Sequence, residues 1–174
     1  MRRSFVLGAR CLALAAWCLV SGCGTGYCWR SSVPKEMRTV SVPTFRNESS
    51  VAELGAIAAR QVLREFQREG TFGIRSAGDA ALEIQGVVKS AQPTVGAYDR
   101  RSGARMVSYD FRSVVEVSVV DKRNGRVLID GREYVAQANF TAGQDRTTAM
   151  RDASGRLMDD LSRQVVDDVL NMKW

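Results

Sequence analysis

Histidine is absent from the sequence, and few of its cysteines are positioned to act as nucleophiles or metal ligands. Without histidine, the chain lacks the commonest general base and the commonest nitrogen ligand of zinc. Two of the four cysteines, Cys11 and Cys18, lie in an apolar segment near the start, and Cys28 has no histidine to activate its thiol. A glycine-rich phosphate loop is missing too. We therefore predict that the protein is not an enzyme and holds no metal and no cofactor.

Long apolar runs are also missing, which argues against a membrane-spanning helix. The stretch from Cys11 to Val20 is mostly apolar, but it is shorter than a bilayer requires. Arg2 and Arg3 precede it, so that a basic segment is followed by a short apolar one. This order is typical of a secretory signal peptide. We predict a signal peptide over residues 1–22.

The end of this signal peptide holds a cysteine in a defined setting. Leu19 and Val20 are followed by the small residues Ser21 and Gly22 and then by Cys23. An aliphatic residue, two small residues and a cysteine resemble the lipobox of bacterial lipoproteins. The resemblance implies cleavage before Cys23, lipidation of its sulfur with diacylglycerol, and attachment to a membrane through this lipid. The alternative is an ordinary secretory signal in which the cysteine falls by chance.

Basic residues exceed acidic ones only slightly in the mature chain. The sequence has 25 basic and 19 acidic residues, and the loss of Arg2, Arg3 and Arg10 leaves 22 against 19, a net charge of +3. Such a small excess does not indicate a general nucleic-acid binder, so we expect no nucleic acid among the partners. With Cys23 lipidated, Cys28 stands alone and an internal disulfide is not expected.

The mature chain divides into a tether and one domain. Glycines, serines and Pro34 make residues 23–36 an irregular segment, which we interpret as a lipidated tether. The remaining length suits a single domain, residues 37–174, that buries its own core.

Hydrophobic residues in this domain recur with period two in some segments and with period 3.6 in others. A capping box formed by Ser50 and Glu53 is expected to open the first helix, and Gly70 to end it. The expected elements are a strand at 38–42, a turn at 44–49, a helix at 50–69, strands at 80–90, 106–121 and 126–141, and a helix at 144–172.

These elements predict an α+β fold in the order β-α-β-β-β-α. A four-stranded, mostly antiparallel sheet with both helices on one face, a two-layer sandwich, buries every apolar stripe. Asn124-Gly125 favours a tight hairpin between the last two strands. On the long third strand, Phe111 and Val115 share the apolar face, which we expect to form the core.

Two basic clusters are expected at hairpin tips. The first tip carries Arg100, Arg101 and Arg105 beside Tyr98. Arginine pairs with phosphate in a bidentate way, so the first tip is a candidate site for a phosphate-bearing ligand. The two tips belong to consecutive hairpins and therefore lie at opposite ends of the sheet. Exposed loops are often charged without binding anything, and this alternative applies to both tips. The second candidate tip consists of Lys122, Arg123 and Arg126.

Several short segments follow Cys23 in a recognisable order: Gly26-Tyr27, 38–49, 63–67, 80–86, Tyr98-Asp99 and 115–121. Together they resemble the LPS-assembly lipoprotein family, LptE. The resemblance implies an outer-membrane lipoprotein on the periplasmic face. Such a protein plugs the lumen of the LptD β-barrel, helps it assemble, and contacts lipopolysaccharide on its way to the surface. The resemblance thereby makes the first tip, with Tyr98, Arg100, Arg101 and Arg105, the candidate site for lipopolysaccharide. The family fold, a sheet with two helices, agrees with the elements above, whereas Cys28-Trp29 departs from the family pattern.

A second resemblance leads to a different function. Val40, Val42, Phe45 and Asn47 followed by a helix also occur in periplasmic lipoproteins of the curli-secretion-channel and penicillin-binding-protein-activator type. The long third strand, the short Asn-Gly hairpin and the small size favour LptE. A structural lipoprotein without a ligand is the third possibility.

Overall fold

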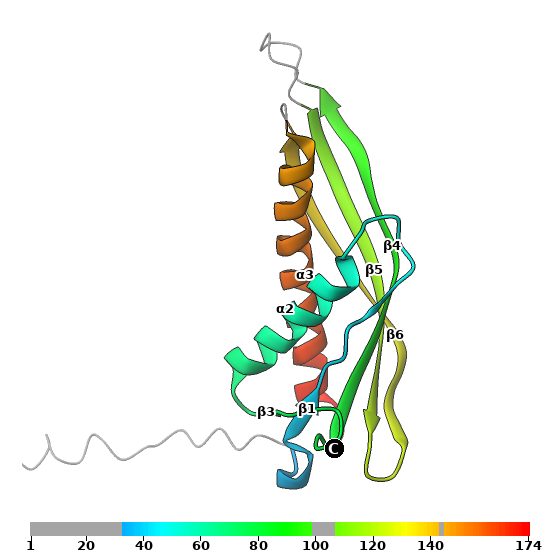
Figure 1. Cartoon of the computed structure of the whole chain (residues 1–174), viewed down its shortest axis with the longest axis vertical. Coiled ribbons are helices and arrows are strands. Elements are labelled where there is room, and N and C mark those ends of the chain that lie inside the picture. Colours follow the sequence, from blue (N-terminus) through cyan, green and yellow to red (C-terminus); the bar gives the residue numbers. More distant parts are fainter. Residues whose placement is uncertain (1–32, 99–106, 143–144) are drawn as a thin grey trace, which may run out of the picture. The chain divides into compact units, whose positions relative to one another are not determined.

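The computed structural model describes residues 33–98, 107–142 and 145–174 (Figure 1). The described part of the chain forms one compact unit with a sheet and two α-helices. Its elements are a 3-10 turn η1 (Lys35–Met37), β1 (Thr39–Ser41), β2 (Arg46–Asn47), α2 (Leu54–Glu69), β3 (Gly73–Ile74), β4 (Leu82–Tyr98), β5 (Val107–Asp121), β6 (Arg126–Ala142) and α3 (Arg146–Asn171).

The sheet has six strands, so the α+β class is confirmed while the predicted number of four strands is wrong. Strands β4, β5 and β6 form an antiparallel meander, and the order across the sheet is β3-β1-β4-β5-β6. The short β1, β2 and β3 all pair in parallel, with β2 joining β4 beyond the end of β1. Strand β2 lies inside the segment expected to be a turn. Two-residue strands show no periodicity, and their pairing depends on distant partners.

Both helices cover the same face of the sheet (Figure 1). Leu82, Ile84 and Val88 of β4 and Phe111 and Val115 of β5 point toward them and are buried, as the alternation predicts. The helices add the apolar side chains of α2 and α3 to a single core. Among the described residues, no helix lies over the opposite face of the meander, and this face is largely polar. The core therefore lies on one side of a long sheet.

Phe45, between β1 and β2, is held by two glycines. Its ring occupies the space that a side chain on Gly86 of β4 would fill, and its carbonyl occupies the space beside Gly55 of α2. A Cβ atom at either glycine would overlap Phe45. Because Phe45 is buried, the segment that follows β1 is fixed between the sheet and the helix.

The expected capping box does not form, and α2 begins later than predicted. Glu53, the residue before the helix, has a positive φ of 61° and its side chain makes no capping hydrogen bond. The preceding loop is instead organised by Asn47, which donates to the Val51 carbonyl (2.8 Å) and accepts from the Ser49 amide (3.0 Å). Side chains that bond their own turn compete with helix capping. The predicted end at Gly70, with φ 82°, is confirmed.

The last helix, α3, is the longest element. Asp145 caps it by accepting a hydrogen bond from the Thr148 amide (3.0 Å), and this bond lowers the pKa of the Asp145 carboxyl. Leu157, Leu161 and the other members of its apolar stripe are buried, while Met150 near its start is only partly buried. The helix packs against α2 and along β6.

Candidate functional site

The predicted site residues fall in three places. Cys23 and the tip arginines Arg100, Arg101 and Arg105 lie outside the described residues. Tyr98 is the last residue of β4, where its backbone pairs with Val107. The second tip is described in full.

The two hairpins turn at opposite ends of β5. We refer to the end that carries Val33, η1 and the turn at 122–125 as the proximal end. Val33 is only 2% exposed, so the expected tether already packs on the domain at this residue, while residues 34–36 are exposed. The distal end is the one where β4 ends at Tyr98 and α3 begins at Arg146 (Figure 1).

At the proximal tip, the side chain of Lys122 binds to other residues of the protein. Its ammonium group lies 2.7 Å from a carboxylate oxygen of Glu83 and 2.6 Å from the Ala77 carbonyl. The hydrogen bond from Lys122, with a further one from Gln85, lowers the pKa of Glu83. This lysine therefore joins the tip to β4 and to the loop before it.

Arg123 is bound to the buried carboxylate of Asp121, which is 1% exposed. Its backbone amide (3.0 Å) and its guanidinium (3.3 Å) donate to the same Asp121 oxygen, and the guanidinium also contacts the Met37 sulfur. Burial raises the pKa of Asp121, but the hydrogen bonds from Arg123 outweigh it and lower the pKa overall. Two of the three tip cations thus have structural partners, while Arg126 is exposed.

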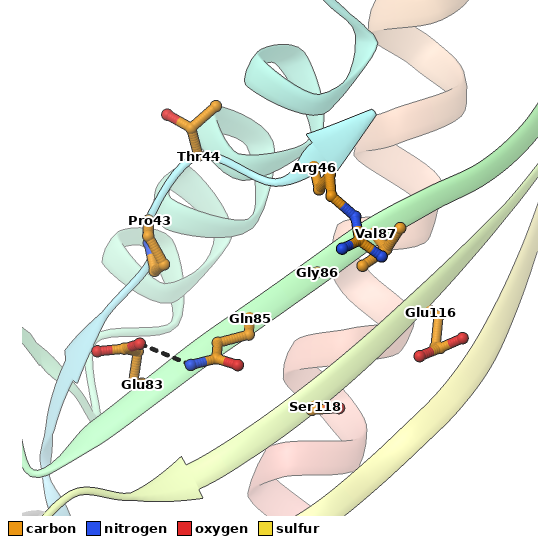
Figure 2. Close-up of a pocket in the computed structure, with 9 residues that line it drawn as sticks. All are labelled: Pro43, Thr44, Arg46, Glu83, Gln85, Gly86, Val87, Glu116 and Ser118. Atoms are coloured by element: carbon orange, nitrogen blue, oxygen red, sulfur yellow. Dashed lines mark hydrogen bonds between the residues drawn. The ribbon is translucent and has the colours of Figure 1, made fainter. Parts of the chain in front are cut away.

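A hollow of about 380 Å³ lies on the helix-free face near the proximal end (Figure 2). The segment between β1 and β2 forms one wall, and β4 and β5 form the floor. Figure 2 shows Arg46 reaching across β4 toward Val87, and Gln85 bonded to Glu83. The lining residues are Pro43, Thr44, Arg46, Glu83, Gln85, Gly86, Val87, Glu116 and Ser118.

The charged groups around this hollow neutralise one another. Arg46 pairs with Glu48 (2.7 Å), and Lys89 pairs with Glu116 (3.2 Å). The hydrogen bond to Glu116 raises the pKa of the Lys89 ammonium. Glu83 is already held by Lys122. A hollow whose charges are all paired does not attract an anionic ligand strongly.

The distal end has a different character, because aromatic rings and a cation gather there. The rings of Tyr109 and Phe140 stack with centroids 5.0 Å apart, and Phe111 packs edge-on against Phe140 (6.3 Å). The guanidinium of Arg146 lies 4.8 Å above the Tyr109 ring, a cation–π contact. This cluster joins the start of α3 to the ends of β5 and β6.

The exposed cations at the distal end form no ion pair among the described residues, although Arg151, after the hydrogen bonds from Thr148, contributes to the lowered pKa of the Asp145 carboxyl. Arg112 on β5 and Arg146 and Arg151 on α3 are exposed, and none of them makes an ion pair in this part of the chain. The acids Asp110 and Asp152 are exposed there too, while Asp145 is used as the cap of α3. Our sequence reasoning missed Arg146 and Arg151, although Asp145 followed by Thr148 is a recognisable helix start.

The described ranges contain no cluster of metal-ligating side chains. Neither α-helix found there is long and apolar enough to cross a bilayer.

The described residues form a one-sided α+β domain in which most tip cations are paired at the proximal end, while exposed arginines lie near aromatic rings at the distal end. This arrangement suits the class of binding or assembly domains. Within that class, residues 37–170 match the LptE family, described as lipopolysaccharide-assembly. The chain belongs to this family. It is accordingly a non-enzymatic lipopolysaccharide-assembly protein, and the resemblance noted in its sequence is confirmed.

Solved structures with a similar chain path are much less similar in sequence. A lipoprotein from Caulobacter crescentus is 14% identical, with 73% of this chain and 88% of that chain covered and a TM-score of 0.48. A hypothetical protein from Chlamydia trachomatis is 14% identical (77% and 96% covered, TM-score 0.49), and the PelC dodecamer subunit from Paraburkholderia phytofirmans is 16% identical (74% and 89%, TM-score 0.42). No curated protein matches the chain.

Proposed function

We propose that this protein is an outer-membrane lipoprotein that plugs and helps assemble an LptD-like β-barrel and contacts lipopolysaccharide during its delivery to the cell surface. Lipid on Cys23 anchors it to the periplasmic face of the membrane. The match to the LptE family over residues 37–170 carries the proposal. The lipobox supports the anchor, since two or three acyl chains hold a protein on a bilayer without a spanning helix.

The anchor has a direct test. The intact mass of the membrane form should exceed that of the polypeptide from Cys23 onward by two or three acyl chains. The variant Cys23→Ser should remain uncleaved and carry no acyl mass. Wild-type protein without added mass would contradict the anchor.

The barrel partner is tested by purification. Tagged protein extracted from outer membranes with detergent should bring down one large β-barrel protein in equal amount. A ring of identical subunits would instead support a secretion-channel function. Tagged protein that emerges alone would contradict both.

We propose that lipopolysaccharide contacts the distal end of the domain. Arg112, Arg146 and Arg151 are exposed there without ion pairs in the described part of the chain, and the predicted tip with Arg100, Arg101 and Arg105 joins β4 to β5. A guanidinium that is not already paired can bind a phosphate without first losing a partner. Charge-assisted contacts of this kind contribute about 1.5–3 kcal/mol when partly desolvated and less when open to solvent.

Replacing Arg100, Arg101 and Arg105 by glutamate should weaken binding of purified lipopolysaccharide at least about tenfold, or about 1.4 kcal/mol. Binding to the wild type should also weaken as salt is raised, because exposed charges are screened. A triple change at Lys122, Arg123 and Arg126 is a poor control, since it would put acids beside Asp121 and Glu83. The better control is glutamate at Arg60, Arg64 and Arg75, which are exposed and change the net charge equally. Equal lipopolysaccharide binding by both triple variants would contradict a binding site at the distal end.

A further inference from the structure

Strand β6 forms one border of the sheet. It pairs only with β5 in the described structure, and from Arg132 to Ala142 that pairing runs without a register shift. A regular border strand presents backbone N–H and C=O groups that another strand can use. At a rise of about 3.4 Å per residue, this stretch is roughly 34 Å long.

The backbone groups that face this border can be identified. The Lys122 amide donates to the Ala81 carbonyl (2.8 Å), which fixes the phase of hydrogen bonding between β4 and β5. Consecutive residues of an antiparallel strand bond to opposite sides, so even-numbered residues of β5 bond to β4 and odd-numbered ones to β6. With Val115 opposite Tyr134, the register then turns the alternate residues of β6 outward. These are Glu133, Val135, Gln137, Asn139 and Thr141.

The other border of the sheet is protected. Its proximal part is covered by β1, β2 and β3. The distal part of β4 carries Pro93 and a bulge between Val95 and Ala97, two features that prevent strand addition. Residues 132–142 of β6 have no proline, no lysine and no bulge, and Val135 is 38% exposed. Within the described part of the chain, the β6 border is therefore the one suited to pairing with another strand.

Two hollows lie along this border, between β6 and α3. One of about 380 Å³ is lined by Arg132, Glu133, Tyr134 and Val135 together with residues of α3. The other, about 320 Å³, is lined by 139–141 and by Ala149, Asp152 and Arg156 of α3. Consecutive strand residues point to opposite faces, so they line the same hollow only where it opens at the strand edge. An edge strand beside a helix is a known arrangement for binding an extended peptide.

The charged residues of the hollow at 132–135, the one nearer the proximal end, indicate which side chain of a bound segment fits there. Arg132 pairs with Asp168 (3.1 Å), which leaves Glu133 and Asp167 without a cation partner among the described residues. Burial and the nearby Asp168 raise the pKa of the Tyr134 phenol, so this hydroxyl stays neutral. A basic side chain is therefore favoured here. Because β6 runs from the proximal to the distal end, an antiparallel partner strand places its C-terminal part in this hollow.

We infer that the β6 border and α3 form a strand-addition site for an extended polypeptide segment with a basic residue near its C-terminal end. The segment adds to β6 as an antiparallel strand, and its backbone bonds to the five outward-facing residues. This inference does not depend on which barrel the protein serves.

A labelled synthetic peptide of alternating threonine and valine that ends in two lysines tests the site on the full chain in detergent. Gln137→Pro removes one outward amide without breaking the ladder to β5, and it should weaken peptide binding at least about tenfold. Gln137→Thr keeps the amide and should bind like wild type. Asp167→Asn with Glu133→Gln should weaken this peptide but not one with uncharged ends. Thermal unfolding of each variant shows that it is folded.

Amide hydrogen exchange gives the second readout. Peptide should slow exchange at the amides of Val135, Gln137 and Asn139, while Ala136 and Ala138 are already protected by β5. Absence of peptide binding, or binding that Gln137→Pro leaves unchanged, would overturn the inference. Protection of the same amides by raised protein concentration alone would show that the occupant is a second copy of the chain, which would also overturn it.

Discussion

The proximal and distal ends of the β4–β6 meander use the same residue types in opposite ways. At the proximal end, Lys122 and Arg123 are bound to Glu83 and to the buried Asp121. At the distal end, Arg146 lies on an aromatic ring, and Arg151 has no ion-pair partner in the described residues. A paired cation contributes to the structure of the protein itself. A cation without an ion pair remains available to an anion. Apart from Arg126, which is exposed at the proximal tip, the two ends therefore differ in the availability of their charge and not in its amount.

The largest change in stability is expected at Phe45, which packs against Gly55 and Gly86. Phe45→Ala should lower the free energy of unfolding by about 3–5 kcal/mol, because a buried ring is lost and a cavity remains. Gly86→Ala should cost about 1–3 kcal/mol by overpacking against the same ring, and much less in the Phe45→Ala background. Urea unfolding of the two single variants and the double variant measures this. Purely additive costs would show that the two residues do not act together.

A smaller effect is expected from the buried ion pair of the proximal tip. Asp121→Asn should lower the free energy of unfolding by about 1–3 kcal/mol at neutral pH, because charge-assisted bonds from Arg123 are weakened. The folded-state pKa of Asp121 lies below its unfolded value, so its contribution is full above pH about 4 and is lost as the pH falls through the folded pKa. The difference between wild type and variant should shrink in acid.

Thermal unfolding between pH 3 and 7, values chosen to bracket the usual carboxyl pKa of about 4, checks this prediction. Lipopolysaccharide binding at neutral pH should be unchanged in the folded Asp121→Asn variant. A loss of binding there would mean that the proximal tip belongs to the ligand site after all.

The smallest change in stability is expected at the distal end, from Arg146→Ala. The side chain is exposed and lies on Tyr109, so the unfolding midpoint should move little, by an energy of about 0.5–1 kcal/mol at most. Lipopolysaccharide binding should fall several-fold, and Arg60→Ala, an exposed arginine of α2, should leave it unchanged. Unchanged lipopolysaccharide binding in both variants would show that Arg146 does not contribute to the binding site.

Long elements with regular hydrophobic periods were predictable from the sequence, and short ones were not. The buried faces of β4, β5 and α3 follow directly from alternation at residues such as Ile84, Phe111 and Leu161. Strands β2 and β3 have two residues each, so only their pairing with β4 and β1 defines them. The capping box failed because Asn47 organises the loop before α2. Asn47 lies three residues before Ser50 and is therefore not part of the Ser50–Glu53 pattern.

The sequence indicated the second candidate tip but not the state of its charges. Lys122 and Arg123 look like free cations in a hairpin, whereas their partners include Glu83, which is far away in the chain. Arg146 was overlooked because its ring partner, Tyr109, lies on another element. Whether a charge is available depends on contacts that local patterns do not encode.

The left-handed Glu53 before α2 has a consequence for the order of folding. A non-glycine residue in this conformation costs of order 1–3 kcal/mol, and without a side-chain cap the start of α2 has little local support. That support comes from Phe45 docking between Gly55 and Gly86, a contact between segments distant in sequence. The β4–β6 meander needs only neighbouring strands, so it is expected to form first. The first turn of α2 then closes late, after the rate-limiting step, and substitutions there should speed unfolding more than they slow folding.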